Sequence, residues 1–197
     1  MSITNLQDKP IIIGTPVEIG SAINKIRTAL TTIPWLERAY FIAERFQRES
    51  NGRKFWFPET YAPTAPGRRD YTRLTPDNDF KGRSFFMVGR GSMEHDDHGE
   101  NRITYPVGLI VSVNLDLIDS AKLDGGLFTD ELIRDVRTLL TANRMKYLFE
   151  YKVETETRDL REVFREFSME NIEDYNRAPM QTFRFDMSIT IQQDCQY

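Results

Sequence analysis

Apolar and polar residues alternate most strictly near the end of the chain, over residues 180–192. The apolar positions are Phe183, Phe185, Met187, Ile189 and Ile191. Period-2 alternation is typical of a β-strand with one buried and one solvated face, whereas a helix would scatter these side chains around its circumference. Burying five side chains of this size contributes roughly 7–15 kcal/mol before ordering costs. We therefore expect a core strand here, with partners supplied by the rest of the chain.

Three other segments have apolar residues at helical spacing. The first begins with the capping sequence at residues 15–18 and ends before Pro34. The second is expected from Thr129, as its cap, to Asn143, and a third begins near Asp159. Each of these helices has one apolar stripe, so each is expected to cover the face of a sheet.

The remaining strands are predicted from apolar runs and turn residues. Asn51-Gly52 stands between two strand-like runs, which is a strong signal for a β-hairpin. Its return strand, residues 54–57, is expected to stop at Pro58 because proline cannot donate to a sheet ladder. Further strands are predicted at 35–46, 84–88, 103–117 and 147–154.

The order of these elements predicts an α+β fold: a mainly antiparallel sheet with two or three amphipathic helices packed on one face. A length of 197 residues fits a single domain that spans residues 1–197. Within it, residues 1–14 form an N-terminal arm. Residues 61–83 and 89–101 are rich in proline, glycine and polar residues, which predicts long decorated loops.

Charge, cysteine content and hydropathy exclude or disfavour several classes of protein. The net charge is −4, which disfavours a protein that grips nucleic acid across an open face. The single cysteine, Cys195, excludes an intrachain disulfide framework. There is no secretory signal and no apolar run long enough for a membrane helix, so we expect a protein made and kept in a reducing cytoplasm, without a membrane partner.

Motifs for catalysis or cofactor binding are absent from the sequence. The only two histidines, His95 and His98, stand among carboxylates in residues 94–100, and these are ligand types that zinc or manganese accepts. Their spacing matches no defined metal motif and the segment is predicted to be a loop, so we expect a solvated loop. Residues 88–92 lack the phosphate-loop patterns, and no GxSxG nucleophile elbow occurs. We therefore predict no catalytic, cofactor-binding or metal-binding residues, and no enzyme.

Basic and aromatic residues in the predicted loops are the remaining candidates. Basic residues interleaved with aromatics can bind single-stranded nucleic acid by stacking. The acidic balance of the chain favours instead loops that are solubilising or that reach a neighbouring subunit. The candidate residues for a subunit interface are Arg68, Arg69, Tyr71, Arg83, Arg90, His95 and His98.

Four segments, together with the order of the elements, carry a resemblance to a known family. They are Ile33-Pro34-Trp35, Phe57-Pro58-Glu59-Thr60-Tyr61, Leu74-Thr75-Pro76-Asp77-Asn78 and Pro179-Met180-Gln181-Thr182-Phe183-Arg184. With them the chain resembles, over most of its length, the tail-terminator and neck-ring proteins of tailed bacteriophages, most of all the tail ring proteins of crAss-like phages. The resemblance implies a structural protein with no catalytic residues and no cofactor.

The resemblance also implies an assembly and a location. Such proteins form homo-oligomeric rings, commonly of six or twelve copies, at the head-to-tail connector or in the tail of the virion. Their neighbours are portal, neck or tail proteins, and DNA passes nearby without specific binding. Assembly takes place in the host cytoplasm. Two alternatives stay open: a small-molecule-binding protein or enzyme that uses the open face of the sheet, and an accessory domain that binds nucleic acid through the basic residues between Arg68 and Arg83.

Overall fold

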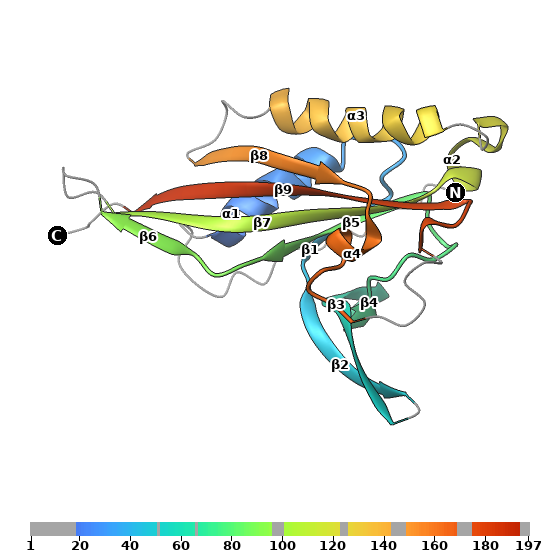
Figure 1. The fold of residues 1–197 in the computed structure, drawn as a ribbon, viewed down its shortest axis with the longest axis horizontal. Coiled ribbons are helices and arrows are strands. Elements are labelled where there is room, and N and C mark those ends of the chain that lie inside the picture. Colours follow the sequence, from blue (N-terminus) through green and yellow to red (C-terminus); the bar gives the residue numbers. More distant parts are fainter. Residues whose placement is uncertain are drawn as a thin grey trace.

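The computed structural model describes residues 19–50, 52–65, 67–95, 101–122, 126–142, 149–168 and 175–193. The fold is α+β, as predicted (Figure 1). The helices are α1 (Ile19–Leu30), α2 (Leu115–Asp119), α3 (Gly126–Ala142) and α4 (Leu160–Val163), with a 3-10 turn at Ser120–Lys122. The strands are β1 (Arg38–Ile42), β2 (Glu44–Ser50), β3 (Arg53–Ala65), β4 (Arg68–Arg73), β5 (Gly82–Val88), β6 (Ser92–His95), β7 (Asn101–Asn114), β8 (Glu150–Thr157) and β9 (Met180–Gln193).

The larger sheet has the strand order β1-β5-β7-β9-β8, and β6 also pairs with β7. Among the described strands of this sheet, only the β1–β5 pair is parallel and the other pairs are antiparallel, which confirms the prediction of a mainly antiparallel sheet. Strands β7 and β9 pair without interruption from Asn101↔Gln193 to Asn114↔Met180. The closing strand is therefore central to the sheet, as its alternation predicts.

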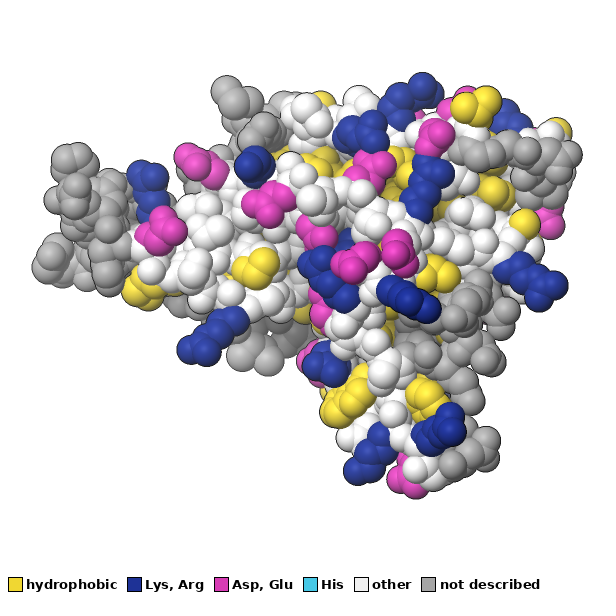
Figure 2. Space-filling view, in the orientation of Figure 1, with side chains coloured by type: hydrophobic (Ala, Val, Ile, Leu, Met, Phe, Trp, Pro, Cys, Tyr) yellow, Lys and Arg dark blue, Asp and Glu magenta, His cyan; other side chains and the backbone are white. Residues whose placement is uncertain are grey.

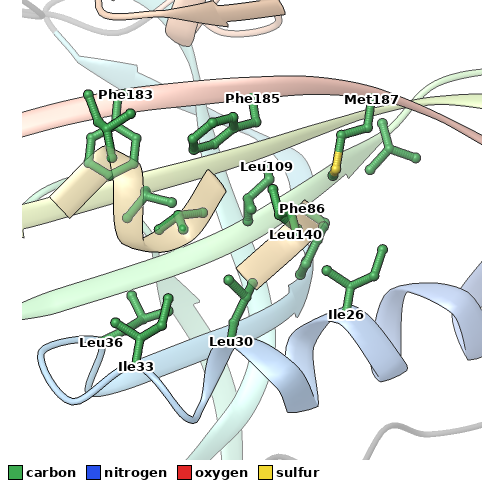
Figure 3. Close-up of a cluster of buried hydrophobic side chains, with 14 of the residues drawn as sticks. Ile26, Leu30, Ile33, Leu36, Phe86, Leu109, Leu140, Phe183, Phe185 and Met187 are labelled. Carbon is green, nitrogen blue, oxygen red and sulfur yellow. The ribbon is translucent and has the colours of Figure 1, made fainter. Parts of the chain in front are cut away.

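Helices α1 and α3 cover one face of this sheet and enclose the main core. The alternating side chains of β9 point into it, with Phe183, Phe185 and Met187 facing the α1 residues Ile26 and Leu30 (Figure 3). The segment after α1 is also joined to α3 by a hydrogen bond, which the Trp35 indole nitrogen donates to Asp135 at 3.0 Å. The two long amphipathic stripes of the sequence thus lie where they were predicted, on one face.

Helix boundaries differ in detail from the predictions. Helix α1 ends at Leu30, and Ile33 follows in a turn; the predicted cap at residues 15–18 lies outside the described residues. Helix α3 begins at Gly126, so Thr129 is a buried residue inside the helix and not its cap. Helix α4 begins after Asp159, whose carboxylate accepts a hydrogen bond from the Arg161 amide, but it is only one turn long.

The predicted hairpin is confirmed, because β2 and β3 pair antiparallel up to Ser50↔Arg53. Its return strand does not stop at Pro58 as predicted, and β3 continues to Ala65. The amide of Trp56 points away from β2 and donates to the Ser168 carbonyl. Two residues further on, the nitrogen of Pro58 faces the same side, so its missing N–H removes no bond to β2.

The prediction of a long loop at residues 61–83 is wrong. This segment contains the end of β3, all of β4 and the start of β5, and only residues 66–67 and 74–81 lie between these strands. Strands β3 and β4 form a second hairpin in which Tyr61 pairs with Tyr71. Proline-rich composition does not reveal this pairing, because strand formation depends on the partner that the fold brings alongside.

The second predicted loop, residues 89–101, is also partly a strand. Strand β6 pairs with the start of β7, with Met93 opposite Ile103, and so extends one end of the larger sheet. Three predicted features lie outside the described residues: the N-terminal segment 1–14, residues 96–100 of the second loop, and Cys195.

The second face of the larger sheet is covered over only part of its length. Over the covered part, residues of α4 and β3 pack on the sheet and form a second apolar cluster with Phe85 and Ile110. Thr182 and Arg184, on the polar side of β9, are therefore buried, although the alternation predicts them to be solvated. Further along the same face, Ser188 and Thr190 are half-buried, as expected for the uncovered part.

Candidate functional site

A second, three-stranded sheet projects from the body of the molecule (Figure 1). Strand β1 passes through Ala43 into β2, so the chain leaves the edge of the larger sheet and enters the smaller one. Strands β2, β3 and β4, residues 44–73, are called the arm below. Within the described part of the chain, β2 pairs only with β3, and its side chains from Glu44 to Glu49 are exposed.

An exposed aromatic cluster lies on one face of the arm. Phe46, Tyr61 and Tyr71 come from three different strands, and their exposed fractions are 38%, 48% and 46%. The ring of Tyr71 lies 5.1 Å from that of Phe46 and 5.4 Å from that of Tyr61, measured between centroids. They meet because residues that stand opposite one another in paired strands share a face. Aromatic side chains left in water at this density are unusual for a surface without a partner.

A buried carboxylate lies among the cluster's strands. Glu59 is fully buried, and one of its oxygens accepts hydrogen bonds from Arg48 at 2.8 and 2.6 Å. Its other oxygen, Oε2, has no hydrogen-bond partner within the described part of the chain. The Arg73 guanidinium lies 3.8 Å from the centroid of the Phe57 ring, a cation–π contact. The aromatic face is therefore bordered by two arginines that are held in place.

The arm is basic, whereas the chain as a whole is acidic. Residues 44–73 contain seven arginines and lysines but only four acidic residues, against a net charge of −4 for the whole chain. Figure 2 shows basic and hydrophobic side chains together on the projecting part of the molecule. This surface combines phenylalanine, tyrosine and arginine, which are enriched at protein interfaces, and tyrosine and arginine are also among the residue types that contribute most binding energy there.

The structure brings together only some of the predicted interface residues. Arg68, Arg69 and Tyr71 all lie on β4 in the arm, and Arg68 forms an exposed ion pair of 3.4 Å with Asp70. Arg90 is exposed but lies between β5 and β6 and not on a strand of the arm. His95 is the last residue of β6 and its side chain is not among those described, and His98 lies outside the described residues.

The prediction for Arg83 is wrong, because this residue is buried with an exposed fraction of 3%. It lies on β5 and forms an ion pair of 2.5 Å with Asp77 from the segment that precedes β5. Burial lowers the pKa of the Arg83 guanidinium, an effect that the charge of Asp77 offsets only in part. Arg83 therefore holds the 74–81 segment on the sheet and does not face a partner.

Two members of the aromatic cluster, Phe46 and Tyr61, were missed by the sequence analysis. The signal was present, because Phe55, Phe57 and Tyr61 stand at odd positions of one continuous strand. It was hidden by the expectation that the strand ends at Pro58. Phe46 joins the cluster only through the register of β2 on β3, in which it faces Phe57.

A cavity of about 380 Å³ opens on the second face of the larger sheet, beside α4. Four of its five charged residues bind one another, and Glu154 is the fifth. Arg184 donates to Glu166 at 2.6 and 2.7 Å and to Asp186 at 2.7 Å, and Arg165 donates to Asp186 at 3.0 and 2.8 Å. Burial alone would lower the pKa of Arg184, but Glu166 and Asp186 outweigh it and raise that pKa. Since these charges satisfy one another, the network anchors α4 to the sheet.

Possible metal sites, possible membrane spans and known protein families give no further indication of function for the described part of the chain. Within the ranges that the structure describes, no group of three histidine, cysteine or acidic residues could hold a metal ion. No helix in those ranges is long and apolar enough to cross a membrane. No protein-family model matches the chain, and no curated protein matches it either.

Proposed function

We propose that the protein is a structural subunit of a tailed-phage virion that forms a homo-oligomeric ring at the head-to-tail connector or in the tail, around the DNA channel. The observation that carries this proposal is the arm, with its exposed aromatic cluster and its excess of basic residues. The family resemblance of the sequence supports the same function. Assembly would take place in the host cytoplasm, next to portal, neck or tail proteins.

The arm supports assembly on physical grounds. A projecting sheet with aromatic side chains in water exposes apolar surface at a free-energy cost of about 25 cal/mol per Å², which a partner would remove. An arm that docks on a different patch of the next copy makes a head-to-tail contact. Such contacts close into a ring when the rotation between copies permits.

The proposal is tested by measuring the mass of the purified protein with light scattering and by imaging it in negative stain. We expect a closed ring, and Tyr71→Ala should raise the concentration for half-assembly roughly tenfold or more, as for an interface hot spot. Leu127→Ala is the matched control, because Leu127 is exposed on α3 and distant from the arm in sequence. A monomer at every concentration, together with its absence from virions, would refute the proposal.

A second candidate function rests on the same surface. Aromatic rings beside arginines on an antiparallel sheet can also stack the bases of single-stranded nucleic acid. In that case the monomer should bind a labelled single-stranded oligonucleotide. The affinity should fall steeply with salt and should fall further in Tyr61→Ala. Oligonucleotide binding by a wild-type monomer would favour this function over the ring.

A further inference from the structure

The side of the molecule opposite the arm has a surface of complementary chemistry. In the strand order of the larger sheet, β1, which leads into the arm, is one edge and β8 is the other. Strand β8 pairs only with β9 among the described residues. Figure 1 shows the β2–β3 hairpin and β8 on different sides of the body.

A cavity of about 330 Å³ lies between β8 and α3. Leu140, Tyr151 and Val153 form its apolar wall, and Glu154 and Glu156 belong to its lining from β8. This volume is within the range of pockets that hold aromatic and apolar groups. Arg137 from α3 also belongs to the lining and binds Glu156, so Glu154 is the acidic lining residue that forms no ion pair with a described residue. A pocket with an apolar wall and this carboxylate beside it matches a projecting surface of aromatic rings and basic residues.

The charges on the two surfaces are opposite. Strand β8 carries Glu150, Glu154 and Glu156 against the single Lys152. Of these, Glu156 is bound by Arg137 at 2.5 Å, whereas Glu150 and Glu154 are exposed and form no ion pair with a described residue. The β2–β3 hairpin of the arm carries four basic and three acidic residues: Arg45, Arg48, Arg53 and Lys54, and Glu44, Glu49 and Glu59. Arg48 and Glu59 bind each other, so the remaining basic residues still outnumber the acidic ones by three to two.

We infer that the arm of one copy docks on the β8 edge and its adjoining cavity in the next copy. This inference rests on the proposed ring and names the two surfaces that build it. Because the arm and β8 lie at opposite edges of one subunit, the contact is head-to-tail and repeats around a ring. A bulge between Val153 and Thr155 interrupts β8, so side chains and not a long backbone ladder make the contact.

Charge reversal tests the pairing directly. Variant A carries Arg53→Glu and Lys54→Glu on the hairpin, and variant B carries Glu150→Lys and Glu154→Lys on β8. Each variant alone then faces like charge across every interface, and the concentration for half-assembly should rise roughly 100-fold. Arg177→Glu is the control, because this exposed residue lies outside both surfaces and should leave assembly unchanged.

Mixing provides the decisive measurement. In an equimolar mixture, the acidic hairpin of A meets the basic β8 of B, and the basic hairpin of B meets the acidic β8 of A. The mixture should therefore regain the wild-type mass with alternating copies, while each variant alone keeps the melting temperature of the wild-type subunit. If the wild type assembles but neither variant weakens it, the ring stands and this pairing is wrong. A wild type that stays monomeric at every concentration and is absent from virions overturns both proposals.

Discussion

Arg184 lies in the middle of β9 with an exposed fraction of 2%, and its place depends on a glycine in the neighbouring strand. A Cβ atom on Gly108 would lie 2.6 Å from Cζ of Arg184. The guanidinium is held in addition by the Val163 carbonyl at 3.0 Å and by Glu166. A buried charge is tolerated only when it is paired and hydrogen-bonded. The helix α4 can therefore cover Arg184 only because Val163 and Glu166 bind its guanidinium.

Gly108→Ala should therefore destabilise the protein by about 1–3 kcal/mol, the usual cost of overpacking. The added methyl group displaces an arginine that cannot move without losing its partners. Gly20→Ala is the control, since its Cβ would lie 3.5 Å from the Phe41 ring, an ordinary contact, and alanine favours a helix. Chemical denaturation of both variants measures the free energies of unfolding, and equal losses would contradict the account.

The pH dependence of Asp186 gives a second test. Burial alone would raise its pKa, but Arg184 and then Arg165 outweigh it, so the pKa of the carboxyl in the folded protein lies below 3.8. The stabilisation is therefore complete above the unfolded value of 3.8 and is lost as the pH falls through the lower folded value. Asp186→Asn should cost about 1.5–3 kcal/mol near neutral pH, the contribution of a hydrogen bond to a charged group. This difference between wild type and variant should shrink below about pH 4.

At the scale of elements, β9 shows how one strand can have three environments. Its apolar side chains face α1 and α3 along most of its length. On its polar side, Thr182 lies under the cover and donates to the Tyr175 carbonyl at 3.1 Å, whereas Ser188 lies on the uncovered part. The environment of a polar residue on this strand thus depends on its distance from α4.

Three substitutions on β9 should separate these environments. Phe185→Asp should abolish folding, because it buries an unpaired carboxylate in place of a ring whose removal alone costs about 3–5 kcal/mol. Thr182→Asp should also destabilise the subunit, since Thr182 is buried. Ser188→Asp should leave it folded, because this position is half-buried and stands opposite Lys152. Circular dichroism melts compare the three, and equal damage from Thr182→Asp and Ser188→Asp would contradict the division of the polar face.

At the scale of the whole molecule, charge is distributed unevenly. The arm is basic and projects from one edge of the larger sheet, while the opposite edge strand is acidic. Such a subunit is electrically polar, which fits the proposed ring, because opposite charges would meet in a head-to-tail contact and not in a contact between identical surfaces.

Salt should therefore weaken assembly. Raising the ionic strength from about 0.1 M to about 1 M shortens the screening length from about 10 Å to about 3 Å, which reduces attraction between exposed charges. Sedimentation velocity should show a shift toward smaller species at high salt. The Arg53→Glu, Lys54→Glu variant should shift the other way, because salt also screens the repulsion between its like-charged surfaces. Assembly that strengthens with salt would indicate an interface dominated by apolar contacts instead.

The sequence by itself determined the elements whose pattern is local: the alternation of Phe183 to Ile191, the Asn51-Gly52 hairpin, and the apolar stripes of α1 and α3. Period and turn chemistry are properties of neighbouring residues, so they can be read along the chain. The tertiary structure decided the features that depend on residues distant in sequence. It paired Tyr61 with Tyr71 inside a predicted loop, and the register of β2 on β3 placed Phe46 beside them, which produced the exposed aromatic face. It also buried Arg83 and Arg184, because their counter-charges and covering elements come from other parts of the chain, and burial is set by what packs on a strand.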